Sequence, residues 1–203
     1  PALSYRTPDQ ARRLDAILEE LDIEHAHLAG NSMGGAISAV FAAEFPEHVL
    51  SLGLIDTAGI HEHPAELDRL REKGRNPLIV EDHEDYDELL DFVMEERPFI
   101  PWPISSVMAR EAIANQDINR KIFNDLLKDA GTDFPGILSR IEVPTLVLWG
   151  TEDRVINVRN APLVAQALPN SRLEILEGIG HVPMIEAPER TAELIRETAQ
   201  EAE

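Results

Sequence analysis

Two short apolar segments on either side of one helix-like segment constrain the fold of this chain most strongly. The stretch from His25 to Ala29 alternates into an apolar strand that stops at Gly30, and Val49 to Ile55 is typical of a buried strand. Between them, Met33 to Phe45 is rich in small and apolar residues and ends at Pro46, as a packed helix does. A strand, a helix and a strand within about 30 residues predict a βαβ unit with parallel strands.

The pattern resumes near the C-terminus after a long helical interruption. Strands are predicted at 144–149 and 172–176, and framework helices at 158–167 and 189–200, with a further helix that Thr7 caps and Gln10 completes as a capping box. No strand signal appears between Gly59 and Glu142, where helical periodicity covers 65–73, 85–96 and 105–128. We therefore predict an α/β fold with a mostly parallel sheet of about four strands and an inserted helical cap. The predicted units are the first part of the core (1–59), the cap (60–141) and the second part of the core (142–203).

Charge and composition exclude several classes of partner. The chain of 203 residues carries 38 acidic against 18 basic residues, a formal charge of −20. Phosphate backbones and anionic membrane surfaces attract basic patches, so nucleic acid is excluded and anionic membranes are disfavoured. No apolar run is long enough to span a membrane, no secretory leader is recognisable, and there is no cysteine. We expect a soluble protein, cytoplasmic rather than secreted.

A serine between glycines stands at the junction of the first strand and the helix after it. The segment reads Gly30-Asn31-Ser32-Met33-Gly34-Gly35. At the apex of such a turn a serine adopts a strained backbone that exposes its hydroxyl, and a Cβ at Gly30 or Gly34 is expected to collide with the neighbouring chain. The helix N-terminus and the backbone N–H of Met33 would stabilise a developing oxyanion. The motif predicts a nucleophile; a turn that cradles a phosphate is the alternative.

The base and the acid that a serine nucleophile requires follow later strands. Asp153 lies just past the strand that ends at Trp149, and His181 just past the strand that ends near Leu176. Parallel strands place such residues at one edge of the sheet, and the order Ser, Asp, His is the one used with this type of turn. Glu152 is the rival of Asp153, because a shift of one residue decides which carboxylate faces the histidine.

The other histidines carry little chemical signal. His61 and His63 form a pair in a polar, acidic stretch, which is weak evidence for a metal site. Hydrolysis through an acyl-enzyme needs no metal and no organic cofactor. We expect neither.

These motifs resemble those of serine hydrolases of the α/β-hydrolase fold, with the nearest similarity to bacterial lipases and carboxylesterases. The matching segments are 30–35 (GNSMGG), 148–155 (LWGTEDRV) and 180–189 (GHVPMIEAPE). The resemblance implies that Ser32 is the nucleophile, His181 the general base and acid, and Asp153 its orienting partner. It also implies that the Met33 N–H is half of the oxyanion hole.

The resemblance further implies a serine ester hydrolase that acts on small, apolar, uncharged esters. In the predicted cap, an apolar patch around Phe99 and Trp102 suits an acyl chain or an aryl group. Packing of these side chains on the core is the alternative, so we name them as candidate pocket residues only.

Two other functions fit the same residues. Carbon–carbon bond hydrolases of aromatic ring-fission products also carry Gly-Asn-Ser-Met-Gly, but they usually place tryptophan after the histidine, where this chain has Val182. The third interpretation is a catalytically impaired, truncated hydrolase-fold module used for binding or assembly.

One departure from the family separates this chain from its relatives. Members have about four strands before the serine strand, and a loop among them supplies the second oxyanion N–H. Here the first 29 residues contain no glycine, and one predicted helix precedes the serine strand. A strand that is central in the family would become an exposed edge. We therefore expect a fragment whose open edge pairs with the missing N-terminal piece or with a second copy.

Overall fold

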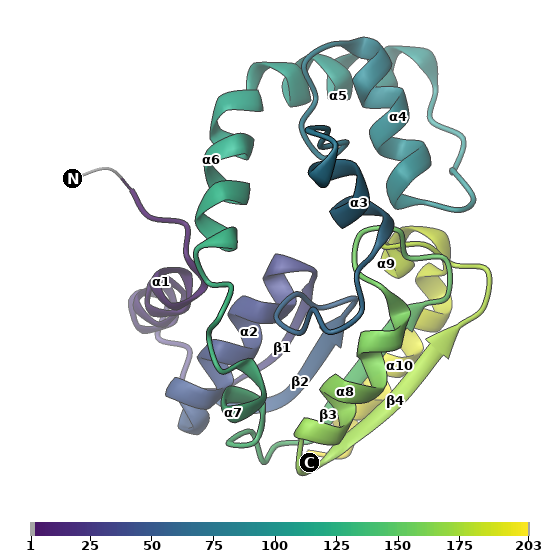
Figure 1. Cartoon of the computed structure of the whole chain (residues 1–203). Coiled ribbons are helices and arrows are strands. Elements are labelled where there is room, and N and C mark those ends of the chain that lie inside the picture. The colour runs from purple at the N-terminus through teal and green to yellow at the C-terminus, as the bar shows by residue number, and fades with distance from the viewer. Residues whose placement is uncertain (1–2, 203) are drawn as a thin grey trace.

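A computed structural model describes residues 3–202 of the chain, and these residues form one parallel sheet with helices on both faces (Figure 1). The strand order is β1-β2-β3-β4, with every neighbouring pair parallel. The strands are β1 (Ala26–Asn31), β2 (Val49–Ile55), β3 (Thr145–Gly150) and β4 (Ser171–Leu176). The predicted α/β class and the four parallel strands are therefore confirmed.

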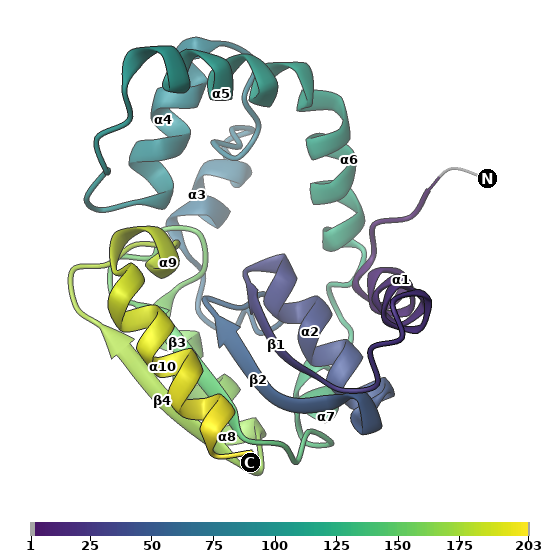
Figure 2. The ribbon, with the colours of Figure 1, turned by 180° about the vertical axis from the view of Figure 1, so that it is seen from behind.

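Helices cover the two faces of the sheet unequally. The helices of the core are α1 (Thr7–Glu20), α2 (Met33–Glu44), α7 (Phe134–Leu138), α8 (Ala161–Ala167), α9 (Pro183–Glu186) and α10 (Pro188–Gln200). One face carries α2 and α8, with α7 packed against both, whereas α10 crosses the other face over β2 and β3, as the reverse view shows (Figure 2). Trp149 and Phe41 are fully buried on the side of α2 and α8, and Leu194 seals the face under α10.

Four helices between β2 and β3 arch over the ends of the strands (Figure 1). They are α3 (Glu66–Glu72), α4 (His83–Val93), α5 (Trp102–Ala114) and α6 (Gln116–Leu127). We call these four helices the cap. The single helix predicted over 105–128 is two helices, because Asn115 leaves helical geometry and ends one helix while starting the next. Residues 134–138 fall inside the predicted cap range, yet their helix packs against the core.

The first helix begins at Thr7 itself, one residue earlier than a capping role for Thr7 predicts, and its cap comes from a distant residue. Thr7 is the first helical residue, and the preceding Arg6 makes no side-chain cap. Instead Oδ2 of Asp129, just beyond α6, accepts hydrogen bonds from the Thr7 N–H (2.8 Å) and its hydroxyl (3.0 Å). The predicted capping role of Thr7 is wrong, because the helix end obtains its acceptor through the fold rather than from its own sequence.

The strand that precedes Ser32 lies at an edge of the sheet. Strand β1 pairs only with β2 among the residues that the structure describes, and none of its six residues is fully buried. Two apolar side chains at the C-terminal end of α1 are also exposed, Ile17 by 54% and Leu21, which directly follows the helix, by 61%. Leu18 of the same helix is buried. An unpaired edge with apolar side chains near it is a surface that invites further pairing.

Within residues 3–202, no helix combines the length and the apolar character that crossing a lipid bilayer requires.

Candidate active site

The turn between β1 and α2 holds Ser32 in a backbone conformation that non-glycine residues rarely adopt. Its φ is 55° and its ψ is −119°, and it is the residue immediately before the first turn of α2. Backbone hydrogen bonds fix this geometry: Ser32 N–H donates to Ile55 O (2.9 Å), and Ser32 O accepts from Ala58 N–H (3.0 Å). Strain of this kind persists only where the surrounding structure enforces it, and it is concentrated at functional sites.

Two glycines make this turn possible, but they are not both the ones predicted. A Cβ on Gly30 would lie 2.2 Å from the carbonyl oxygen of Gly34, so this glycine is required as expected. A Cβ on Gly34 would meet nothing within 4 Å, so the predicted collision there is wrong. The second close approach is at Gly35, where a Cβ would lie 2.5 Å from the hydroxyl of Thr57. The helix therefore approaches the end of β2 through Gly35.

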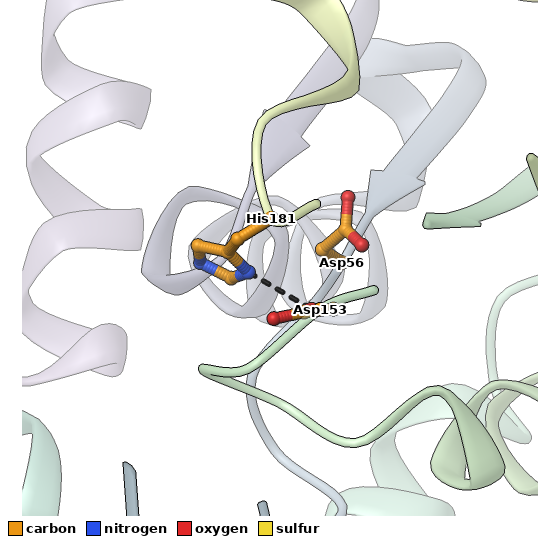
Figure 3. Close-up of side chains that lie close together, drawn as sticks. All are labelled: Asp56, Asp153 and His181. Atoms are coloured by element: carbon orange, nitrogen blue, oxygen red, sulfur yellow. Dashed lines mark hydrogen bonds and ion pairs between the residues drawn. The ribbon is translucent and has the colours of Figure 1, made fainter. Parts of the chain in front are cut away.

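His181 and Asp153 form a buried hydrogen-bonded pair (Figure 3). The Nδ1 of His181 lies 2.9 Å from Oδ2 of Asp153, and both residues are buried. Because a carboxylate accepts, Nδ1 carries the proton and Nε2 is left as the acceptor. Glu152 instead accepts from the hydroxyl of Thr151 at the surface. Of the two rival carboxylates, the structure places Asp153 against the histidine.

The loop that carries His181 is attached to the serine turn. The side-chain amide of Asn31, the residue before Ser32, donates to the carbonyl of His181 (3.0 Å) and to that of Ile55 (3.2 Å). Backbone hydrogen bonds and the Asn31 amide thus connect the turn at Ser32 to the loop of His181 at the carboxyl ends of the strands, where sheets of this type arrange their sites, while no hydrogen bond joins the Ser32 hydroxyl to His181 among the described residues. The N–H of Met33, the first residue of α2, has no partner within the helix and borders the same cavity as Ser32.

The same loop is also attached to the cap. His181 N–H donates to Val93 O at the end of α4 (2.8 Å). Glu186 in α9 accepts from Gly180 N–H with one carboxylate oxygen (2.9 Å) and from the N–H groups of Glu95 and Glu96 with the other (2.7 and 3.0 Å). One carboxylate therefore joins the histidine loop to the segment that follows α4.

Sequence analysis missed a third acidic residue, Asp56, which directly follows β2. Its φ is 43°, its side chain is fully buried, and its Oδ1 accepts from Gly150 N–H (3.0 Å). Burial raises the pKa of Asp56 well above its usual range, and the neighbouring carboxylate of Asp153 raises it further. Its place at a strand end, in line with Ser32 and Asp153, is the signal that could have identified it.

Asp56, Asp153 and His181 could in principle offer atoms to a metal ion. One candidate ligand atom from each residue lies within 4.8 Å of the others. The hydrogen bond between Asp153 and His181 nevertheless uses the Nδ1 and Oδ2 atoms that face each other (Figure 3). The arrangement is that of a hydrogen-bonded base and acid, and His61 and His63, the weak metal signal in the sequence, are not members of the cluster.

A cavity of about 1060 Å³ lies between the serine turn and the cap. Ser32 and Met33 border it, together with apolar side chains of α2, α3, α6 and the loops beside them, including Val40, Leu67, Phe123 and Ile156. The candidate pocket residues Phe99 and Trp102 are not among its lining residues, and their side chains are 91% and 80% exposed. The apolar cap patch, which lies before and at the start of α5, therefore faces outward.

Known protein families and individual proteins share sequence similarity with this chain. The profile of the α/β-hydrolase fold family matches residues 1–77 and 97–188. The chain belongs to the α/β-hydrolase fold family. Within it, the chain is 35% identical over 192 residues to lipase 1 of Psychrobacter immobilis, an alignment that covers 93% of this chain and 60% of the lipase. It is 31% identical over 198 residues to mouse monoacylglycerol lipase ABHD6, covering 92% and 59%.

A solved structure is also very similar to this chain. The crystal structure of a membrane phospholipase A, described as a bacterial virulence factor, superposes with a TM-score of 0.95 at 39% identity. The superposition covers 99% of this chain and 65% of that one. The chain therefore spans about 60% of the length of the curated relatives it matches.

The glycines of the serine turn yield a matched pair of substitutions. Gly30→Ala should destabilise the protein by about 1–3 kcal/mol, because its Cβ would overlap backbone that cannot move away. Gly34→Ala should be neutral or stabilising by up to about 1 kcal/mol, because it adds a helix-favouring methyl in open space. Urea unfolding of both variants measures the difference. Equal destabilisation by the two changes would contradict the assignment of Gly30 as the glycine that the turn requires.

Proposed function

We propose that the protein is a serine ester hydrolase of the lipase or carboxylesterase type that acts on apolar, uncharged esters. The observation that carries the proposal is the buried Asp153–His181 pair, which Asn31 joins to the strained turn at Ser32. Nucleophile, base and orienting carboxylate are the three parts that acyl transfer to a serine requires. The similarity to lipases supports the same reaction class.

In the proposed reaction, Ser32 Oγ attacks the ester carbonyl and Nε2 of His181 accepts its proton. The Asp153 carboxylate stabilises the imidazolium that forms and keeps the ring oriented through Nδ1. The imidazolium then donates the proton to the leaving alcohol, which leaves an acyl-enzyme. His181 next activates a water molecule, whose attack releases the acid and restores Ser32. Neither a metal nor an organic cofactor takes part in these steps.

The oxyanion of the tetrahedral intermediate needs at least two donors, and the chain offers one clear candidate. The Met33 N–H lies at the N-terminus of α2 beside Ser32, where the helix dipole favours negative charge. We assign the second donor to backbone outside these 203 residues. Loss of one such donor lowers kcat by about 10²- to 10³-fold, so the rate of the isolated chain depends on it.

The cavity supports apolar substrates. It is lined largely by aliphatic and aromatic side chains, and its volume of about 1060 Å³ exceeds what a short acyl chain needs. An acyl chain that enters from Ser32 would pass between α2 and α6 rather than under Phe99 and Trp102.

A carbon–carbon bond hydrolase is the second candidate within the family. It would use the same serine turn. Val182 argues against it, because these hydrolases usually have tryptophan at the position after the histidine. Turnover of a ring-fission dienoate with no turnover of simple esters would favour this candidate over the esterase.

Covalent labelling tests the nucleophile. A fluorophosphonate probe should form an adduct that mass mapping places on Ser32, and the adduct should be lost in Ser32→Ala and strongly reduced in His181→Ala. Both variants should remain folded, as thermal unfolding would show. A longer protein that contains these residues and forms no adduct would contradict the proposal, whereas failure of the 203-residue chain alone would indicate that it lacks part of the site.

The choice between the two neighbouring carboxylates has a separate test. Asp153→Asn should lower kcat by about 10⁴-fold, because an amide favours the wrong tautomer of the histidine. Glu152→Gln should change kcat by no more than about twofold, as is usual for a surface substitution. Steady-state kinetics with a p-nitrophenyl ester measure both. A larger loss in the Glu152 variant would reverse the assignment.

We further propose that the open edge of β1 pairs with another strand, either from outside these 203 residues or from a second copy. The exposed backbone of β1 and the exposed Ile17 and Leu21 support this.

Size-exclusion chromatography with light scattering tests the open edge. The 203-residue chain should elute as a dimer or larger species, or with a bound peptide, and Ala29→Pro in β1 should reduce this association because proline removes an N–H that a paired strand needs. A monodisperse monomer without bound peptide would contradict this part of the proposal.

A further inference from the structure

Asp56 has no task in the proposed reaction, although it lies beside the residues that do. Its carboxyl group, that of Asp153 and the imidazole of His181 meet within 4.8 Å (Figure 3). Unlike Ser32 and His181, Asp56 is wholly enclosed: its exposed fraction is 0%, so it cannot contact a substrate. Any effect on the reaction must therefore pass through a neighbour.

The hydrogen bonds of Asp56 are incomplete for an ionised carboxylate. Oδ1 accepts from the Gly150 N–H, whereas no donor among residues 3–202 reaches Oδ2, which is buried. A buried anionic oxygen without a donor costs several kcal/mol, and the charge is commonly avoided by binding a proton. A protonated carboxyl group in the same place would instead carry an O–H that can donate a hydrogen bond.

The charges around Asp56 also favour the protonated form. The titratable groups that face it are Asp153 from the loop after β3, His181 from the loop after β4, and Glu186 from α9. Two of these three are carboxylates, and together with burial they raise the pKa of Asp56. Two carboxyl groups this close cannot both ionise without a large cost.

Asp153 offers the acceptor that such a proton needs. Its Oδ1 accepts from Val155 N–H (2.8 Å) and Ile156 N–H (2.9 Å), and its Oδ2 accepts from His181 (2.9 Å). These three donors leave one of the roughly four acceptor positions of a carboxylate unused. Carboxyl oxygens of Asp56 and Asp153 lie within 4.8 Å of each other, and so close an approach of two carboxyl groups is favourable only when one of them carries a proton.

We propose that Asp56 is a positioning residue: as a neutral carboxylic acid it donates a hydrogen bond to the Asp153 carboxylate and holds that carboxylate facing Nδ1 of His181. This inference rests on the proposed function, because the task of Asp153 does. A purely structural role, in which Asp56 only accepts from Gly150 and links the ends of β2 and β3, would need no proton on Oδ2.

Infrared spectroscopy observes the proton directly. At pH 8 the difference spectrum between wild type and Asp56→Asn should contain the carbonyl band of a protonated carboxylic acid, and the band should shift in D₂O. Absence of this band would overturn the inference, because an ionised Asp56 cannot donate. The measurement does not depend on enzyme activity.

Kinetics test the positioning role. Asp56→Asn keeps a donor and an acceptor without charge, so kcat should stay within about threefold of wild type. Asp56→Ala should lower kcat by about 10- to 100-fold with little change in KM. This is the range found when a group that hydrogen-bonds to a functional side chain and orients it is removed. The acid limb of kcat/KM should not move in Asp56→Asn, because no charge is removed; an ionised Asp56 would stabilise the imidazolium, and its loss would move that limb to lower pH.

Thr145→Val is the matched control for general destabilisation. Thr145 is buried at the opposite end of β3, and its hydroxyl donates to Val143 O. The variant should lose stability yet keep kcat. If Asp56→Ala lowers kcat no more than this control, or if Asp56→Asn loses as much kcat as Asp56→Ala, the positioning role is overturned.

Failure of this inference differs from failure of the proposed function. If the wild-type protein hydrolyses no ester, the proposed function fails and the positioning role fails with it, while the infrared band still decides whether Asp56 is neutral. If hydrolysis is intact and lost in Ser32→Ala, but the Asp56 variants behave as described for the overturning results, only the inference on Asp56 fails.

Discussion

The parallel ladder of backbone hydrogen bonds is the constraint on which the rest of this structure depends. It continues one residue past β1, β2 and β3: Ser32 N–H donates to Ile55 O, Asp56 N–H to Leu148 O and Thr151 N–H to Leu176 O. Because each strand end is attached to the next in this way, the residues that follow the strands are held at one edge of the sheet. The strained turn at Ser32, the buried Asp56 and the loop to Asp153 all begin at these bonds.

Residues whose role follows from local chain geometry could be predicted from the sequence. The parallel strands, the turn at Ser32 and the placement of Asp153 and His181 after their strands depend on short segments whose pattern carries the information. The choice between Asp153 and Glu152, by contrast, could not be made from the sequence, because side-chain direction in a loop changes with every residue. Local pattern therefore located the turn at Ser32 and the loops of Asp153 and His181, but not the cavity or Asp56.

Features that depend on packing between distant segments could not be predicted. Gly35, rather than Gly34, is where α2 meets the end of β2, since Thr57 lies across from it only in the folded chain. Thr7 obtains its cap from Asp129, and Phe99 and Trp102 are exposed rather than turned toward the core. Asp56 was overlooked because an aspartate after a strand is also typical of an ordinary turn; its position at a strand end was a signal, but its burial beside a second carboxylate is visible only in the fold.

The Glu186 carboxylate has a consequence for motion. Through it and through the bond from His181 to Val93, four backbone N–H groups tie the histidine loop to the chain at the end of α4. The loop that holds the imidazole and this end of the cap are thus joined by the same hydrogen bonds. Opening of the cap on this side would therefore either break these hydrogen bonds or displace the loop that carries the imidazole.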